Sequence, residues 1–163
     1  MVLLGLTGEA GLIAKRSRMN IRTKEGKQYV LCAWRRRFVR LTPEELVRQT
    51  TLQLLVDEYG YSHNLIAVEV PISVAGKPKR CDAIVYDQQM NPLMLIEFKA
   101  PTVQLTQEVF DQAAIYNRHL HVPYLMLCNG QNSVVAQILE TKYQFLPAIP
   151  IYSKLQTPKL LNP

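Results

Sequence analysis

The sequence has few cysteines, no long apolar run and no glycine-rich phosphate motif, and each absence excludes a class of protein. The three cysteines, Cys32, Cys81 and Cys128, lie far apart, so we expect neither a disulfide framework nor a zinc site with closely spaced cysteines. No stretch approaches the roughly 18 to 20 apolar residues that span a membrane. Nothing matches G-x-x-x-x-G-K-[ST], so we expect no ATP site within these 163 residues.

The chain has enough apolar material for one folded domain. Its residues are 48% hydrophobic and 20% charged, with seven Gly and ten Pro, which excludes collagen-like and low-complexity disordered chains. The N-terminal stretch 1–14 is mildly apolar, but Glu9 interrupts it and its positive charges follow it. A secretory signal has the opposite order, so we expect a cytoplasmic protein without a membrane segment.

Positive charge is concentrated near the N-terminus. The formal net charge is +6; residues 1–40 carry ten Lys and Arg against two acidic residues, whereas the rest of the chain carries nine against eleven. A basic segment on a nearly balanced body suits a polyanion such as DNA. A solvated basic surface that only keeps the protein in solution explains the same charges.

Turn residues predict a small hairpin, followed by a well-marked helix. Residues 24–27 favour a turn between strands at Ile21–Thr23 and Gln28–Trp34, and Phe38–Leu41 predicts another short strand. Thr42 then takes the N-cap position, a proline follows it, and Glu45 stands three residues after the cap. This spacing is typical of a capping box, so we expect a helix from there to the glycine at position 60.

Three strands, a second helix and two more strands complete the predicted core. Short loops favour an antiparallel meander for the first three strands, and the crossover through the helix should make the third and fourth strands parallel. The result is a mixed α/β fold (α+β mixed sheet) of order α-β-β-β-α-β with the hairpin in front. The predicted elements are strands at Leu65–Val74, Cys81–Tyr86 and Leu93–Phe98, a helix at about 107–120, and strands at Tyr124–Cys128 and Val134–Leu139.

The domain boundaries follow from the same pattern. We expect a loosely ordered leader over residues 1–18 and a single domain over 19–143, with its hairpin at about 21–41. Beyond that domain, residues 144–163 are punctuated by proline and predict an irregular tail.

Two carboxylates are predicted to face one another inside the sheet. Glu97 and Lys99 are two residues apart and share one face of a buried strand. If the preceding turn is centred just after Gln89, Asp82 faces Glu97 and Arg80 faces Lys99. Carboxylates about 5 Å apart repel unless a proton or a cation lies between them. Mg²⁺, which is held by one or two carboxylates and several waters, would remove that repulsion.

A structural explanation of the same residues stays open. Glu97 and Lys99 can form an ion pair at the end of a sheet, because charged residues are common there. Asp82 can cap a turn. No single residue carries the prediction of a site; it depends on the acidic pair, the lysine and the order of the elements together.

These residues resemble a known nuclease family. Arg80-Cys-Asp82 followed by Glu97-Phe-Lys99 resembles the PD-(D/E)xK nuclease superfamily. The stretches 41–49, 65–69 and 106–112 resemble the N-terminal domain of type I restriction enzyme R (restriction and motor) subunits. The resemblance covers roughly residues 21–139 and implies a restriction-endonuclease-like core that hydrolyses DNA with Mg²⁺, or Mn²⁺ as a substitute. It also implies DNA, other restriction-modification subunits or a second copy of the chain as partners.

The resemblance assigns roles to individual residues. Asp82 and Glu97 would bind the metal together with the backbone carbonyl of Phe98. Lys99 would orient or activate the attacking water and offset charge in the transition state. Metal-assisted hydrolysis of a phosphodiester bond is the reaction that such a set supports.

Four further residues are weaker candidates. Gln112 and Tyr116 match a Q-x-x-x-Y element of some of these nucleases and would share one helix face, but a solvated Gln and a half-buried Tyr explain the pair as well. Family members often add an acid on the first helix. Glu45 is the candidate here, although its place in the capping box accounts for it equally, and Gln49 is a possible substitute.

Basic residues near the predicted site are candidates for contact with DNA, and a solvated turn is the alternative explanation for the arginine run. If the fold is kept but the chemistry is not, the chain is a catalytically inactive DNA-binding or protein-interaction module; a purely structural subunit is a third reading. The DNA-contact candidates are Arg35, Arg36, Arg37, Lys77, Lys79 and Arg80.

Overall fold

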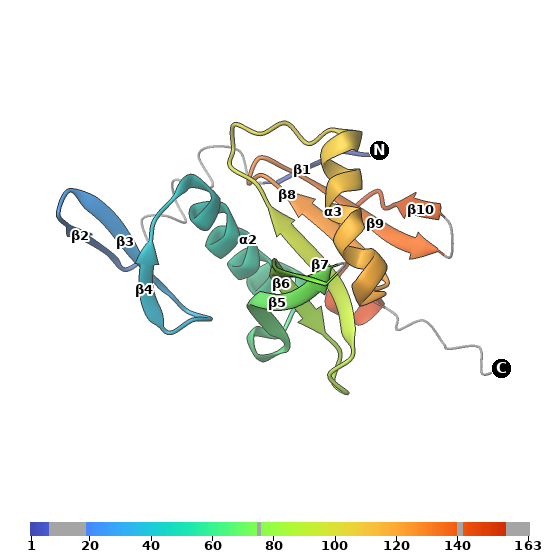
Figure 1. The fold of residues 1–163 in the computed structure, drawn as a ribbon, viewed down its shortest axis with the longest axis horizontal. Helices are drawn as coiled ribbons and strands as arrows, with labels where there is room; N and C mark the ends of the chain where they lie inside the picture. The colour runs from blue at the N-terminus through green and yellow to red at the C-terminus, as the bar shows by residue number, and fades with distance from the viewer. Residues whose placement is uncertain (7–18, 75, 140–141, 156–163) are drawn as a thin grey trace.

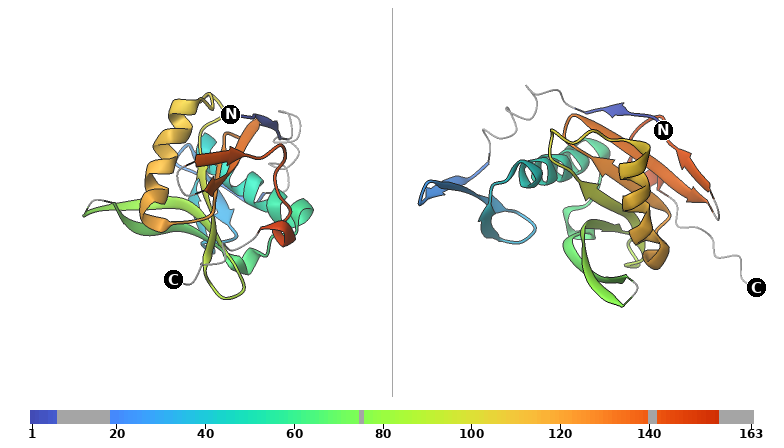
Figure 2. Two further views of the ribbon diagram at one scale, coloured as in Figure 1. Left: turned by 90° about the vertical axis from the view of Figure 1, so that its right-hand side faces the viewer. Right: turned by 45° about the horizontal axis from the view of Figure 1, so that its top comes forward.

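In a computed structural model, the chain forms a mixed sheet with a helix on each face and a small separate sheet beside it (Figures 1 and 2). The structure describes residues 1–6, 19–74, 76–139 and 142–155. Within these ranges no helix is long and apolar enough to cross a membrane. The helices are α2 (Pro43–Tyr59) and α3 (Gln107–Leu120), with short 3₁₀ turns η1 (His63–Leu65) and η2 (Tyr152–Lys154). The strands are β1 (Leu4–Gly5), β2 (Ile21–Lys24), β3 (Lys27–Cys32), β4 (Arg37–Arg40), β5 (Ile66–Val74), β6 (Lys77–Tyr86), β7 (Pro92–Phe98), β8 (Tyr124–Cys128), β9 (Asn132–Leu139) and β10 (Lys142–Phe145).

The main sheet confirms the predicted topology. Its strand order is β1-β9-β8-β7-β6-β5, with β10 also paired to β9. Strands β5, β6 and β7 form the antiparallel meander, and β7 runs parallel to β8 after the crossover through α3. The central strands β7 and β8 are buried almost throughout, as expected for parallel neighbours covered on both faces.

Side chains of β7 point alternately to the two faces of the sheet, so the core has one layer under each helix. Met94 and Ile96 face α2, whereas Leu95 faces α3. Each helix therefore covers one face of the sheet with its own apolar stripe, and the sheet lies between two packed layers. The α2 layer includes Val47, Leu52 and Leu55, and the α3 layer includes Phe110, Ala113 and Ala114.

Only half of the predicted capping box forms at the start of α2. The hydroxyl of Thr42 accepts the main-chain N–H of Glu45 at 3.1 Å, as predicted. The Glu45 side chain does not return to Thr42, whose own N–H donates to the carbonyl of Arg40. Glu45 instead accepts hydrogen bonds from Arg35 and Arg48. Charged donors bind a carboxylate more strongly than a neutral amide does. The Glu45 carboxylate therefore binds the two arginines and not the main-chain N–H of Thr42.

The hairpin predicted near residue 21 is a three-stranded antiparallel sheet of β2, β3 and β4, which we call the β2–β4 sheet (Figure 1). Its first turn contains Glu25 and Gly26, both at positive φ, as a tight hairpin requires. The second strand ends at Cys32, two residues earlier than predicted. Trp34, just beyond it, stacks on His63 with ring centroids 4.5 Å apart and so links this sheet to the core.

The chain ends are more closely attached than the sequence suggests. A leader was expected over 1–18, but Leu4–Gly5 form β1 on the edge of β9; residues 7–18 lie outside the described residues. In the C-terminal segment, the Tyr61 hydroxyl donates to the carbonyl of Pro150 and the Tyr152 hydroxyl donates to that of Tyr86. Part of this segment is regular, since Gln144 and Phe145 belong to β10 and Tyr152–Lys154 form the turn η2, and the segment up to residue 155 packs on the core.

The N-cap of α2 provides a test of this local structure. Replacing Thr42 by Ala removes the acceptor for the Glu45 N–H, and we expect a loss of about 1 kcal/mol in the free energy of unfolding. Urea unfolding monitored by circular dichroism measures this change. Thr42→Ser is the control: it keeps the hydroxyl and should retain most of the stability. Equal stability of the Ala and Ser variants would contradict a capping role.

Candidate functional site

The register of β6 and β7 brings Asp82 next to Glu97. Ala83 lies opposite Ile96 and Val85 opposite Met94, which is the register predicted from the length of the turn. The next position outward from Ala83 and Ile96 is the pair Asp82 and Glu97. A shift in the pairing at Tyr86 falls beyond this region and leaves the register of the acidic pair unchanged.

Glu97 is buried beside a second carboxylate, and this environment perturbs its protonation. Its side chain is only 7% exposed. Burial, followed by the negative charge of Asp82, raises the pKa of Glu97 to about 8, while the positive charge of Lys99 and a hydrogen bond from the Asp82 main chain oppose the shift. Among the described residues, Oε1 of Glu97 has no hydrogen-bond partner. A buried carboxylate oxygen without a partner is costly and favours a proton or a cation there.

Asp82 is held by two donors. Its Oδ1 accepts from Nη2 of Arg48 at 2.8 Å, and its Oδ2 accepts from the main-chain N–H of Phe98, also at 2.8 Å. Arg48 comes from α2 and Phe98 from β7. These contacts fix the Asp82 carboxylate at the junction of the helix and the sheet, next to Glu97.

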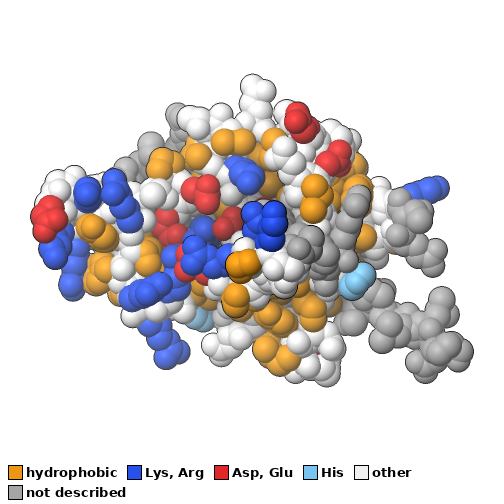
Figure 3. All heavy atoms as spheres, in the orientation of Figure 1, with side chains coloured by type: hydrophobic (Ala, Val, Ile, Leu, Met, Phe, Trp, Pro, Cys, Tyr) orange, Lys and Arg blue, Asp and Glu red, His pale blue; other side chains and the backbone are white. Residues whose placement is uncertain are grey.

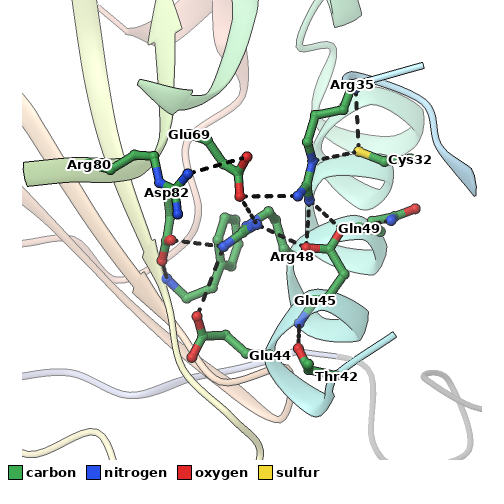
Figure 4. Close-up of polar contacts among 11 residues, drawn as sticks. Cys32, Arg35, Thr42, Glu44, Glu45, Arg48, Gln49, Glu69, Arg80 and Asp82 are labelled. Atoms are coloured by element: carbon green, nitrogen blue, oxygen red, sulfur yellow. Dashed lines mark hydrogen bonds and ion pairs between the residues drawn. The ribbon is translucent and has the colours of Figure 1, made fainter. Parts of the chain in front are cut away.

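Arg48, on α2, belongs to a larger network of charged side chains from several elements (Figure 4). The buried Glu45 carboxylate accepts from Arg48 at 2.9 Å, from Arg35 at 2.5 Å and from the Gln49 amide at 2.8 Å. Arg35 also donates to Glu69 at 3.1 Å. Glu45 and Gln49, which the sequence offered as alternatives, therefore lie in one hydrogen-bonded group.

Arg48 and Glu69 had no predicted role. Glu69 adopts positive φ, at 54°, between the pairs Val68 with Ala83 and Val70 with Cys81. The register is the same on both sides, so no residue is inserted here, and the local backbone conformation accompanies the Glu69 contact with Arg35. In the sequence, both residues lie within stretches that carry the family resemblance, 41–49 and 65–69.

A comparison with protein families identifies the chain. The family described as type I restriction enzyme R protein N terminus (HSDR_N) matches residues 43–150, a span that contains α2, the meander, α3 and the acidic pair. The chain belongs to this family.

The fold of this HSDR_N domain is also found in a solved structure. A structure described as a fragment of an HsdR subunit of a type I restriction enzyme from Vibrio vulnificus YJ016 superposes with a TM-score of 0.56 at 19% sequence identity. The match covers 71% of this chain and 24% of that one, so the chain spans about a quarter of the length of the protein it matches. No match is found among curated proteins.

In this HSDR_N domain, Lys99 and Phe98 adjoin the acidic pair. The Lys99 N–H donates to the carbonyl of Cys128 at 2.8 Å and continues the pairing of β7 with β8. The positive charge of Lys99 lowers the pKa of the Glu97 carboxyl, but burial raises it by more. Phe98 contributes its main-chain N–H to Asp82, while its ring is buried in the core.

Gln112 lies apart from this group. It is exposed on α3 and lines a surface hollow with Glu108, Asp111, Ile115 and Tyr143, whereas the inward face of the helix is apolar. The side chain of Tyr116 lies outside the described part of the chain. The structure therefore does not place Gln112 beside the acidic pair, and amphipathicity of α3 accounts for its position.

The DNA-contact candidates separate into buried and exposed groups. Arg35 is only 11% exposed in its side chain and binds Glu45 and Glu69, so this arginine is committed to the protein rather than to DNA. Arg36 and Arg37 are exposed on the β2–β4 sheet. On β6, Arg80 is 65% exposed and only 3.9 Å from Glu69, and Lys77 and Lys79 are also exposed.

The donors at the acidic pair fit a hard divalent cation with water in its coordination shell. Among the described residues, no group of three or more His, Cys, Asp or Glu side chains is arranged to hold a metal. A metal at this place would bind Asp82 and the partnerless oxygen of Glu97 with waters, and the predicted carbonyl of Phe98 is a further oxygen donor. Such a set suits Mg²⁺, which keeps several waters.

The raised pKa of Glu97 predicts how stability changes with pH. The folded protein holds this proton up to about pH 8, whereas the unfolded chain releases it near 4.5, so the carboxyl lowers stability as the pH rises through this window. Glu97→Gln removes the effect. We expect the variant to gain stability over the wild type between pH 5 and 9, by an amount on the order of a few kcal/mol.

Urea unfolding at several pH values in EDTA measures this difference. Glu108→Gln, at an exposed position of α3, is the matched control and should leave the shape of the pH curve unchanged. A stability difference between Glu97→Gln and the wild type that stays constant from pH 5 to 9 would contradict a buried, protonated Glu97.

Proposed function

We propose that this domain is a divalent-metal-dependent endodeoxyribonuclease of the PD-(D/E)xK kind, acting as the cleavage module of a type I restriction R subunit. The observation that carries the proposal is the buried Glu97 beside Asp82, with one carboxylate oxygen that has no partner in the described part of the chain, and with Lys99 close enough to lower the pKa of Glu97. A purely structural ion pair would satisfy that oxygen. Membership of the HSDR_N family adds the restriction context.

The residues divide the work of phosphodiester hydrolysis among them. A bound Mg²⁺ supplies Lewis-acid polarisation and a water of lowered pKa. Asp82 and Glu97 would hold that ion, and Phe98 keeps Asp82 in place through its N–H. Lys99 places its ammonium group next to the acidic pair, where it offsets the negative charge that develops on the phosphate in the transition state.

Exposed basic side chains provide a surface for the DNA backbone. Figure 3 shows Lys and Arg side chains over the β2–β4 sheet and beside the acidic side chains at the centre of the view. Arg36 and Arg37 lie on the first of these surfaces, and Arg80 lies beside the acidic pair. We infer that DNA phosphates bind to both basic surfaces and that this binding directs a DNA strand toward Lys99.

Partners follow from the family. The chain spans 24% of the length of the HsdR fragment that it matches, and R proteins are components of type I restriction enzymes by the family's own description. We infer that this domain acts with other restriction-modification subunits. An inactive module that binds DNA or protein is the second candidate, and the hydrogen bond of Arg48 to Asp82 favours it, because this contact engages a proposed metal ligand.

Plasmid nicking with Mg²⁺ or Mn²⁺ separates the two candidates. We expect Asp82→Ala and Lys99→Ala each to lower the nicking rate by a factor of about 100 or more, because the first removes a ligand of the metal and the second removes a positive charge beside the reacting phosphate. Lys142→Ala, an exposed lysine of β10, is the control and should nick at the wild-type rate. Equal nicking by all the variants would mean a contaminating nuclease, and binding of DNA without nicking would support the inactive module.

The salt dependence of DNA binding tests the basic surface. Each phosphate contact contributes about 0.9 to the slope of log K against log salt on duplex DNA, so Arg36→Gln with Arg37→Gln should reduce the slope by roughly 2 if each arginine binds one phosphate. Fluorescence anisotropy with a labelled duplex measures the slope. Lys142→Gln removes a charge at the opposite end of the molecule (Figure 1) and should leave the slope unchanged; an equal slope in the double variant would exclude the two arginines from the interface.

A further inference from the structure

Arg48 is surrounded by carboxylates. Its Nη2 lies 2.8 Å from Asp82 and 3.9 Å from Glu44, and its Nη1 lies 2.9 Å from Glu45 and 3.8 Å from Glu69. The residue is only 7% exposed. A buried guanidinium ion needs such partners, because an unpaired charge in the interior is strongly destabilising.

The hydrogen bonding of Arg48 is nevertheless incomplete. A guanidinium has five N–H donors, and its Nε is buried without a partner among the described residues. Glu44 and Glu69 already lie within 4 Å of its nitrogens but beyond hydrogen-bond distance. A small movement of the side chain would exchange the contact with Asp82 for a contact with one of these carboxylates, with the arginine still paired.

The contact with Asp82 conflicts with metal binding. Both oxygens of Asp82 are engaged, Oδ1 by Arg48 and Oδ2 by the Phe98 N–H. Each oxygen keeps a second lone pair for a metal, but a divalent ion bound at this carboxylate would repel the adjacent guanidinium. The Phe98 donor is part of β7 and cannot leave without disrupting the strand, whereas Arg48 is a side chain with other acceptors nearby.

We propose that Arg48 is an internal cation that competes with the divalent metal for Asp82. This inference rests on the proposed function, since it concerns the same acidic pair. Without a metal, Arg48 neutralises Asp82 and keeps the site folded. When a metal binds, Arg48 releases Oδ1 and pairs with Glu44 or Glu69. The domain therefore binds the metal more weakly than two free carboxylates would, and Arg48 sets that affinity.

Calorimetric titration of Mn²⁺ into the metal-free full chain tests the proposal without any activity measurement. Arg48→Gln leaves Asp82 free of the guanidinium, and we expect it to bind Mn²⁺ at least tenfold more tightly than the wild type, because a hydrogen bond to a charged group no longer has to be broken. Arg40→Gln removes the same formal charge from an exposed position on β4 and should change the affinity by no more than about threefold, as screening of exposed charges requires.

A second variant protects the test against loss of folding. Arg48→Lys keeps a positive charge, but one ammonium group cannot bridge Asp82 and Glu45 as the guanidinium does. We expect Mn²⁺ affinity between those of the wild type and Arg48→Gln, together with a native circular dichroism spectrum. Arg48 variants that bind Mn²⁺ with wild-type affinity, or more weakly, would overturn the role of Arg48 as a competing cation.

The same titrations separate this inference from the proposed function. Asp82→Asn and Glu97→Gln should abolish the Mn²⁺ binding in both the wild-type and the Arg48→Gln backgrounds. Binding that depends on Asp82 and Glu97 but is unaffected at position 48 would leave the metal site in place and overturn the competition alone. Absence of Mn²⁺ binding in the wild type and in both Arg48 variants would overturn the two proposals together.

Discussion

Two carboxylates on adjacent strands can be buried together only if a proton or a positive charge offsets their repulsion, and this requirement organises the centre of the molecule. Asp82 and Glu97 are brought together by the register of β6 and β7. Arg48 from α2 compensates Asp82, and Lys99 partly compensates Glu97. The position of α2 on the face of the sheet is therefore fixed by charge as well as by the apolar layer beneath it, and one carboxylate oxygen has no partner among the described residues.

The same charges connect the acidic pair to the β2–β4 sheet. Arg35, in the loop between β3 and β4, shares the carboxylates of Glu45 and Glu69 with Arg48. If metal binding at Asp82 moved Arg48 toward Glu69, the guanidinium groups of Arg48 and Arg35 would share the same Glu69 carboxylate. The proposed metal site and the loop between β3 and β4 thus belong to one network of ion pairs, whose members are too close to respond independently.

Sequence reasoning succeeded where the signal is local and failed where it depends on packing. The register that pairs Asp82 with Glu97 follows from turn length and strand alternation, and the N-cap of α2 follows from Thr42. The role of Arg48 could not be found in this way, because it depends on how a helix far away in the sequence lies across the strands. Gln112 shows the converse: its spacing matched a motif, but the exposed face of α3 explains where it lies.

The stacking of Trp34 on His63 has a practical consequence. Trp34 is the sole tryptophan of the chain, and it lies where the β2–β4 sheet meets the turn before β5, with its ring 4.5 Å from the imidazole. Indole emission is sensitive to polarity and is quenched by a cationic imidazole in contact with it. The intrinsic fluorescence of the protein therefore reports on this one junction, so that displacement of the small sheet can be followed in real time without an attached dye.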